Sequence, residues 1–301
     1  MTETSPRALA PRPAPDYPAA MERLGQLEAL DGPFVNPNCR TQSLTHGAVT
    51  DRAIILAHGM TNCPYQFREL APRFFEQGYN VLIPRLPRNC LRDLDTRALA
   101  GLTLREQIAA GHEMVDIARG LGRHITIVGI SAGGTLVAWL AQHREDVDVA
   151  VTIAPLFGLL PSLPVLNMGA NAAVMRLLQV APNIMTQRVS PFKGGPTQSY
   201  RGFATRGLAS AMRLGAQTLL SATRTAPRAR TILMMLNPAD PAVNNPMSLE
   251  LLRRWQRHGA QAGLYEFDAA RNLIHDVIDP AQAGQQCDYT YPILLERITS
   301  L

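Results

Sequence analysis

Three residues spread along the chain are of the types that cleave an acyl bond by nucleophilic attack. Ser131 lies in the sequence Gly-Ile-Ser-Ala-Gly, and Asp240 and His275 follow it in that order. A serine hydroxyl attacks a carbonyl carbon efficiently only when a base removes its proton, and a histidine oriented by a carboxylate is such a base. The residue types and their order therefore predict Ser131 as nucleophile, Asp240 as acid and His275 as base.

The residues on either side of the pentapeptide around Ser131 make it a stronger indication of a catalytic serine. G-x-S-x-G occurs by chance in about one chain in ten of this length. Here a run of strand-forming residues, 124–130, leads directly into it, and a helical pattern follows over 131–144. Such a strand–turn–helix setting exposes a serine hydroxyl, and glycines at 129 and 133 avoid collisions with the backbone. Dinucleotide binding is disfavoured, because G-x-G-x-x-G needs glycine at position 131.

The acid and the base each follow a predicted strand. Asp240 lies in the loop after residues 231–236, and His275 lies in the loop after residues 264–267. Catalytic groups gather beyond the carboxyl ends of strands in open α/β sheets, so both positions suit catalysis. Two alternatives stay open. Asp240 lies beside prolines and fits an ordinary turn, with Asp268 as the substitute acid, and His275 fits a surface or packing histidine.

Backbone N–H groups are expected to bind the oxyanion that forms when a serine attacks a carbonyl carbon. One donor is predicted to be Ala132, which directly follows the nucleophile. The second is predicted in the loop after the apolar run 53–57, where His58-Gly59-Met60 makes Met60 the candidate.

The elements that must position these residues alternate along the chain. Short apolar runs are typical of buried parallel strands, and apolar residues at helical spacing separate them. An α/β fold with a mostly parallel central sheet flanked by helices follows. The predicted strands are 53–57, 80–84, 124–130, 149–154, 231–236 and 264–267, and the predicted helices are 64–77, 103–119, 131–144 and 248–258.

The alternation of strands and helices stops over the interval 156–227. This interval holds no convincing strand, and it is far longer than an ordinary connection between two elements. We interpret it as a helical cap inserted into a core of residues 51–155 and 228–301. The alternative is that its helices cover one face of the sheet. Residues 1–50 are expected to supply an N-terminal lead and the first sheet strands, and the Pro- and Ala-rich residues 1–20 to be mobile or loosely docked.

Apolar cap residues are candidates for an acyl pocket, because methionine adapts to varied ligand shapes. Phe157, Met168 and Met175 are the predicted substrate-binding residues. The alternative for each is that it packs the cap onto the core.

Composition excludes several other functions. The net charge is +5 and the pI about 9.3, but the basic residues are scattered, so no nucleic-acid partner is expected. The four cysteines form no C-x-x-C pair, so no metal site is predicted and a disulfide is allowed but not required. No secretory signal or integral membrane segment is evident, which predicts a cytoplasmic protein. Neither a cofactor nor a fixed oligomeric state is implied, and a homodimer stays open.

Three segments carry a resemblance to the α/β-hydrolase superfamily, and most closely to bacterial carboxylesterases and monoacylglycerol-lipase-like enzymes. They are LAHGMTNCPYQFRELAPRFFEQGYNVLIPRL, GISAGG and LIHDVID, and the similarity covers residues 50–155 and 228–300. The resemblance implies the same triad, the same two oxyanion donors and a cap that shapes the acyl pocket. In one departure, Asn89 stands where these relatives often have a histidine.

The predicted activity is hydrolysis of a small-molecule carboxylic ester through an acyl-enzyme. The same triad also suits an amide, lactone or thioester hydrolase or an acyltransferase. A different class of function is a non-catalytic protein that binds a small molecule on the same fold. An intact triad argues against that class, because a pure receptor has no need of all three groups.

Overall fold

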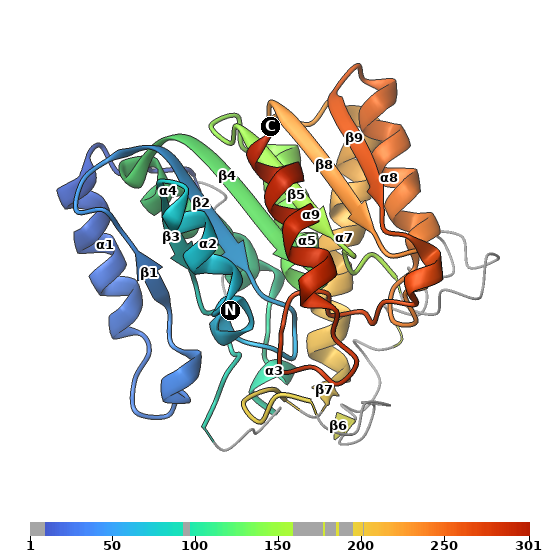
Figure 1. Cartoon of the computed structure of the whole chain (residues 1–301), viewed down its shortest axis with the longest axis horizontal. Coiled ribbons are helices and arrows are strands. Elements are labelled where there is room, and N and C mark those ends of the chain that lie inside the picture. Colours follow the sequence, from blue (N-terminus) through green and yellow to red (C-terminus); the bar gives the residue numbers. More distant parts are fainter. Residues whose placement is uncertain (1–9, 93–96, 159–176, 178–184, 187–194, 201) are drawn as a thin grey trace.

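A twisted seven-stranded sheet forms the centre of the computed structural model (Figure 1). The structure describes residues 10–92, 97–158, 177, 185–186, 195–200 and 202–301. The strand order is β1-β3-β2-β4-β5-β8-β9, with β1 antiparallel to β3 and every other neighbouring pair parallel. The strands are β1 Gln42–Leu44, β2 Thr50–Ala57, β3 Tyr79–Ile83, β4 Gly122–Ile130, β5 Val149–Ile153, β8 Thr231–Leu236 and β9 Gln261–Glu266.

Side chains alternate between the two faces of this sheet and form two cores. Along β2, Ala53 and Ile55 belong to one buried cluster, whereas Ile54 and Leu56 belong to the other. This period of two is the geometry of a strand buried on both faces, which explains the continuous apolar runs in the sequence. Because β2, β4, β5, β8 and β9 are parallel, the loops that follow them meet at one edge of the sheet.

Helices cover both faces (Figure 1). Residues of α1, α4, α5 and α8 contribute to the first cluster, and residues of α2 and α9 contribute to the second. The fold class expected from the sequence is therefore confirmed. The helices are α1 Tyr17–Ala29, α2 Leu70–Glu76, α3 Arg97–Ala100, α4 Leu104–Leu121, α5 Ala132–His143, α7 Thr205–Arg224, α8 Asn245–Arg257 and α9 Cys287–Thr299.

Of the expected loose lead over residues 1–20, the part that the structure describes begins at residue 10 and is docked on the core. Helix α1 begins at Tyr17, where the Asp16 side chain accepts a hydrogen bond from the backbone N–H of Ala19. The helix packs on α4. A Cβ at Gly120 of α4 would overlap Ala20 and the backbone of Asp16, so this glycine allows the close approach.

Helix α7 lies within the interval expected to form a cap, but it packs on α5, α4 and α8 of the core. Gly207 and Gly215 of α7 contact Leu99 and Phe157 so closely that a Cβ at either position would overlap them. Residues 205–224 therefore pack mainly against neighbouring helices, and the division into a core and a cap stays a prediction. A short hairpin of β6 Met185–Thr186 and β7 Phe203–Ala204 precedes α7. Most of residues 159–194 lies outside the described residues, so a cap there stays a prediction.

Candidate active site

Ser131 stands at the junction between β4 and α5 in a conformation that few residues other than glycine adopt. Its backbone angles are φ 56° and ψ −119°. The Ser131 N–H donates to Ile153 O at 3.0 Å, and Ser131 O accepts from the N–H groups of Thr135 and Leu156. These bonds to the neighbouring strand, helix and loop hold a strained residue in place, which is typical of a functional position.

The glycines that flank Ser131 permit this sharp turn. A Cβ at Gly129 would overlap the backbone of Gly133. A Cβ at Gly133 would overlap the carbonyl oxygens of Ala57 and His58, at the end of β2. The expectation that small residues are required at both positions is therefore confirmed, and the reason is backbone contact across the turn.

Asp240 and His275 meet through a direct hydrogen bond. The loops after β8 and β9 carry them, and His275 Nδ1 lies 2.7 Å from Asp240 Oδ2. The Asp240 side chain is fully buried, and its other oxygen accepts from the N–H groups of Ala242 and Val243. The bond to Asp240 leaves Nε2 of His275 as the atom that can accept a proton. Asp268, the substitute acid, is instead exposed and caps a short turn by accepting from Ala270 N–H.

Charge around His275 decides how readily its ring takes up a proton. Burial favours the neutral ring and by itself lowers the pKa of His275, but the Asp240 carboxylate and, more weakly, Asp276 raise that pKa above its ordinary value of 6.5. A basic imidazole held by a buried carboxylate is suited to remove a proton from a nearby hydroxyl.

Met60 lies in a tight turn directly after β2. The turn runs from Gly59 to Asn62 and is closed by a hydrogen bond from Asn62 N–H to Gly59 O at 3.2 Å. That bond does not use the N–H of Met60, which is a central residue of the turn. A Cβ at Gly59 would lie 3.6 Å from the Cβ of Ser131, so the turn is beside the serine.

His58 anchors this turn from inside the protein. Its Nδ1 donates to Gly59 O at 2.8 Å, and its Nε2 accepts from the N–H of Leu86 at 3.0 Å. Burial is the main cause that lowers the pKa of His58 to about 4, so the ring is neutral. His58 therefore joins the loops after β2 and β3 and is unsuited to act as a base.

Ala132 is the first residue of α5 and follows Ser131 directly. The first N–H groups of a helix have no acceptor within the helix, and they lie at the positive end of the helix dipole. The N–H of Ala132 is therefore available beside the serine.

Phe157 is the one predicted substrate-binding residue that lies within the described residues. Phe157 is 1% exposed and belongs to the core cluster that includes Leu214 of α7, with its ring against Gly215. This placement agrees with the alternative that it packs against the core, and a role in an acyl pocket stays a prediction. Met168 and Met175 lie outside the described residues. Asn89, the departure from the related sequences, is buried and donates to Pro87 O within its own loop.

Asn237 is a site residue that the sequence reasoning missed. Its Nδ2 donates to Leu273 O at 2.8 Å, and its own carbonyl accepts from the N–H of Asp240 at 3.1 Å. It therefore connects the loop of Asp240 to the loop of His275. Its only sequence signal is a polar residue at the end of an apolar strand, one residue before a proline.

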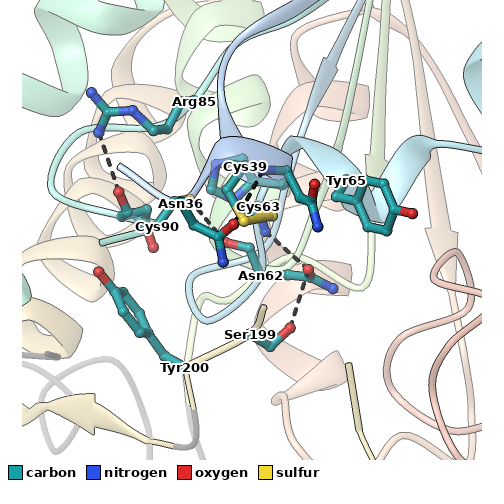
Figure 2. Close-up of a disulfide and its surroundings, with 12 residues drawn as sticks. Asn36, Cys39, Asn62, Cys63, Tyr65, Arg85, Cys90, Ser199 and Tyr200 are labelled. Atoms are coloured by element: carbon teal, nitrogen blue, oxygen red, sulfur yellow. Dashed lines mark hydrogen bonds between the residues drawn. A yellow bond between two sulfur atoms is a disulfide. The ribbon is translucent and has the colours of Figure 1, made fainter. Parts of the chain in front are cut away.

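Three cysteines gather beside the Gly59–Asn62 turn (Figure 2). Cys39 and Cys63 form a disulfide, and Cys90 is a buried free thiol. The three sulfur atoms lie within 4.8 Å of one another, so a thiophilic metal ion would have ligands here only after reduction of the disulfide. Disulfides persist mainly in oxidising compartments, and the cytoplasmic location expected from the sequence stays a prediction. No helix among the described residues is long and apolar enough to cross a membrane.

The parallel sheet, the strained serine after β4 and the later acid–base pair define a class of proteins, the α/β hydrolases. The chain belongs to the alpha/beta hydrolase family, whose model matches residues 54–282. The resemblance seen in the sequence is thus confirmed at the level of the family.

Known lipases resemble parts or most of the chain. Thermostable monoacylglycerol lipase of Bacillus sp. (strain H-257) is 31% identical over 100 residues, which are 33% of this chain and only 39% of that enzyme. Monoglyceride lipase of Saccharomyces cerevisiae superposes with a TM-score of 0.65 at 14% identity, over 87% of this chain and 90% of its own. Monoacylglycerol lipase of Paleococcus ferrophilus gives a TM-score of 0.62 at 15% identity, over 86% and 98%. At these identities the two structures establish a common fold.

Proposed function

We propose that the protein is a serine hydrolase that cleaves carboxylic esters through an acyl-enzyme. The observation that carries the proposal is the Asp240–His275 hydrogen bond of 2.7 Å, at the same edge of the sheet as the strained Ser131. A buried carboxylate that orients a histidine near a partly exposed serine is the arrangement that activates a hydroxyl. The lipases that resemble the chain support ester bonds as the substrate class.

In the first half of the reaction, Ser131 Oγ attacks the carbonyl carbon of the ester while His275 Nε2 takes its proton. Asp240 stabilises the imidazolium that forms. The N–H groups of Met60 and Ala132 donate to the oxygen that becomes negative. The imidazolium then protonates the departing alkoxide, the C–O bond breaks, and the alcohol leaves.

In the second half, His275 takes a proton from a water molecule that attacks the acyl group on Ser131. The same two N–H groups stabilise the second tetrahedral intermediate. When it collapses, His275 returns the proton to Ser131 Oγ and the carboxylic acid is released. These steps use groups of this chain, the ester and water alone.

Hydrolysis of p-nitrophenyl acetate, butyrate and decanoate, and of a long-chain monoacylglycerol, tests the proposal. We expect Ser131→Ala to lower kcat/KM by about 10⁴-fold or more, because the nucleophile is lost. The matched control is Ser248→Ala, which alters a fully buried serine in α8 and should leave the rate unchanged.

Two results would decide against ester hydrolysis by Ser131. Equal rates for the wild type and Ser131→Ala would exclude Ser131 as the nucleophile. Turnover of amides, lactones or thioesters alone, or acyl transfer to an alcohol, would keep the triad and change the reaction. Tight binding of a small molecule without turnover would favour the non-catalytic protein.

A further inference from the structure

Asn62 ends the turn that carries Met60, and its side chain is almost completely buried. The side-chain Oδ1 accepts from the N–H of Cys63 at 2.9 Å and from Ser199 Oγ at 3.2 Å (Figure 2). The Nδ2 group donates to Asp276 Oδ2 at 3.1 Å and to Asp279 Oδ2 at 2.9 Å. These four bonds use the full hydrogen-bonding capacity of the amide.

The partners of Asn62 also determine which way its amide faces. A backbone N–H can only donate, so it must face Oδ1, and ionised carboxylates can only accept, so they must face Nδ2. An aspartate or leucine at position 62 would fill about the same volume, but it would not bond to both the N–H donor and the carboxylate acceptors that surround Asn62. The site at position 62 therefore requires the hydrogen-bonding groups of an asparagine and not only a side chain of its size.

Asp276 and Asp279 belong to the loop that carries His275. The second oxygen of Asp276 accepts from the N–H groups of Ile278 and Asp279, which folds the loop directly after the histidine. Asp279 is fully buried and forms an ion pair with Arg68 at 2.7 Å. Burial, together with the nearby negative charge of Asp276, raises the pKa of Asp279.

Two adjacent carboxylates repel each other, and each needs donors when it is buried. Asn62 supplies one N–H to each of them, whereas Arg68 bonds to Asp279 and Gln282 Nε2 bonds to Asp276. Asn62 is the partner that connects the carboxylates to the turn of Met60.

We infer that Asn62 is a positioning residue, which sets the distance between the oxyanion donor Met60 and the base His275 by tying their two loops together. This inference rests on the proposed function. Asn62 and Asp276 are separated by 214 residues, so only folding brings the loops together. Reacting groups that shift by about 1 Å can lose about 100-fold in rate, so such a tie affects catalysis directly.

The first test is the substitution Asn62→Ala, measured with the p-nitrophenyl ester that the wild type hydrolyses fastest. We expect kcat to fall about 10- to 100-fold while KM stays within about twofold, because the lost geometry matters in the transition state. A rise in KM with unchanged kcat would contradict the inference.

The matched control is Asn80→Ala. Asn80 is also fully buried, and its side chain accepts from His46 N–H and donates to the carbonyls of Ala48 and Leu121 at the other end of the sheet. We expect it to lower the melting temperature and to leave kcat unchanged. Equal losses of kcat in the two variants would mean that Asn62 has only a structural role.

The second test uses Asn62→Asp, which keeps the shape and replaces both donors by a carboxylate. The added negative charge should raise the pKa of His275, which the Asp240 and Asp276 carboxylates already raise. Because the neutral ring is the base, the acidic limb of the rate profile should move to higher pH. An unchanged limb together with an unchanged kcat would overturn the inference.

The His275 ring can also be titrated by NMR with ¹³C-labelled histidine, with its signal assigned by its loss in His275→Ala. This readout needs no turnover. If the wild type and Ser131→Ala cleave esters equally, the proposed function fails, and the titration still decides whether Asn62 affects His275. If the wild type is an active serine esterase and Asn62→Asp leaves both kcat and the His275 titration unchanged, the positioning role alone fails.

Discussion

The disulfide between Cys39 and Cys63 links the N-terminal region to the segment directly after Asn62. Its removal is expected to destabilise the protein. The variant to make is Cys39→Ala with Cys63→Ala. A single substitution would leave one cysteine beside Cys90, whose sulfur lies within 4.8 Å of both disulfide sulfurs, and a new disulfide could form. Alanine suits the site because Cys39 and Cys63 are both fully buried in an apolar cluster.

The expected loss follows from the length of the closed loop. The two cysteines are 24 residues apart. In the chain-entropy model, a cross-link that closes a loop of this length restricts the unfolded chain enough to stabilise the fold by about 3.5 kcal/mol at 25 °C. For a chain of this size, that loss corresponds to a fall of about 5 °C in the melting temperature.

Urea denaturation followed by circular dichroism measures the free energy of unfolding with and without a phosphine reductant. The wild type should lose about 3.5 kcal/mol on reduction, and the double variant should not respond. Cys287→Ala, which removes a buried free thiol, is the control and should respond to reductant as the wild type does. Two free energies of unfolding are compared with that of the oxidised wild type: that of the reduced wild type and that of the double variant. If both are lower by less than about 1 kcal/mol, the chain-entropy reasoning is refuted.

Two further predictions concern the acid and the base. Asp240→Asn should lower kcat by about 10⁴-fold, because an amide neither orients nor stabilises the imidazolium of His275, whereas Asp268→Asn should stay within about twofold. Equal losses in single-turnover assays would contradict the assignment of Asp240. The rate kcat/KM should rise with pH through a midpoint above 6.5, because Asp240 raises the pKa of His275 and the protonated ring cannot act as base. A midpoint below 6.5 in a pH–rate profile would exclude this charge effect.

The regular elements could largely be predicted because they depend on local patterns. The expected strand over 231–236 agrees with β8, and the expected helix over 131–144 agrees with α5, which spans Ala132–His143. The expected strand over 264–267 was less accurate, since β9 spans Gln261–Glu266 and most of its residues are exposed. An edge strand lacks the apolar run that marks a buried one, so its start leaves little signal.

Helix α7 shows where local pattern was insufficient. Its helical character was evident, but the sequence did not say whether it covered the sheet or formed part of a cap. Its packing on α5, α4 and α8, with Gly207 against Leu99 and Gly215 against Phe157, is visible only in the folded structure. A glycine in a helix predicts neither a partner nor a direction, because the close approach depends on the packing of distant segments.

The sequence by itself determined the class of fold and the candidate nucleophile and base. Ser131 was identified because its turn is local, with the strand before it, the helix after it and glycines two residues away on either side. The tertiary structure decided which acid pairs with the base, since Asp240 contacts His275 and Asp268 caps its own turn. It also decided which cysteines pair, and it revealed Asn62 and Asn237 as links between distant loops. A local sequence pattern reflects interactions between residues that are close together in the chain. Hydrogen bonds between residues far apart in the chain form only after the sheet brings the loops that follow its strands to one edge.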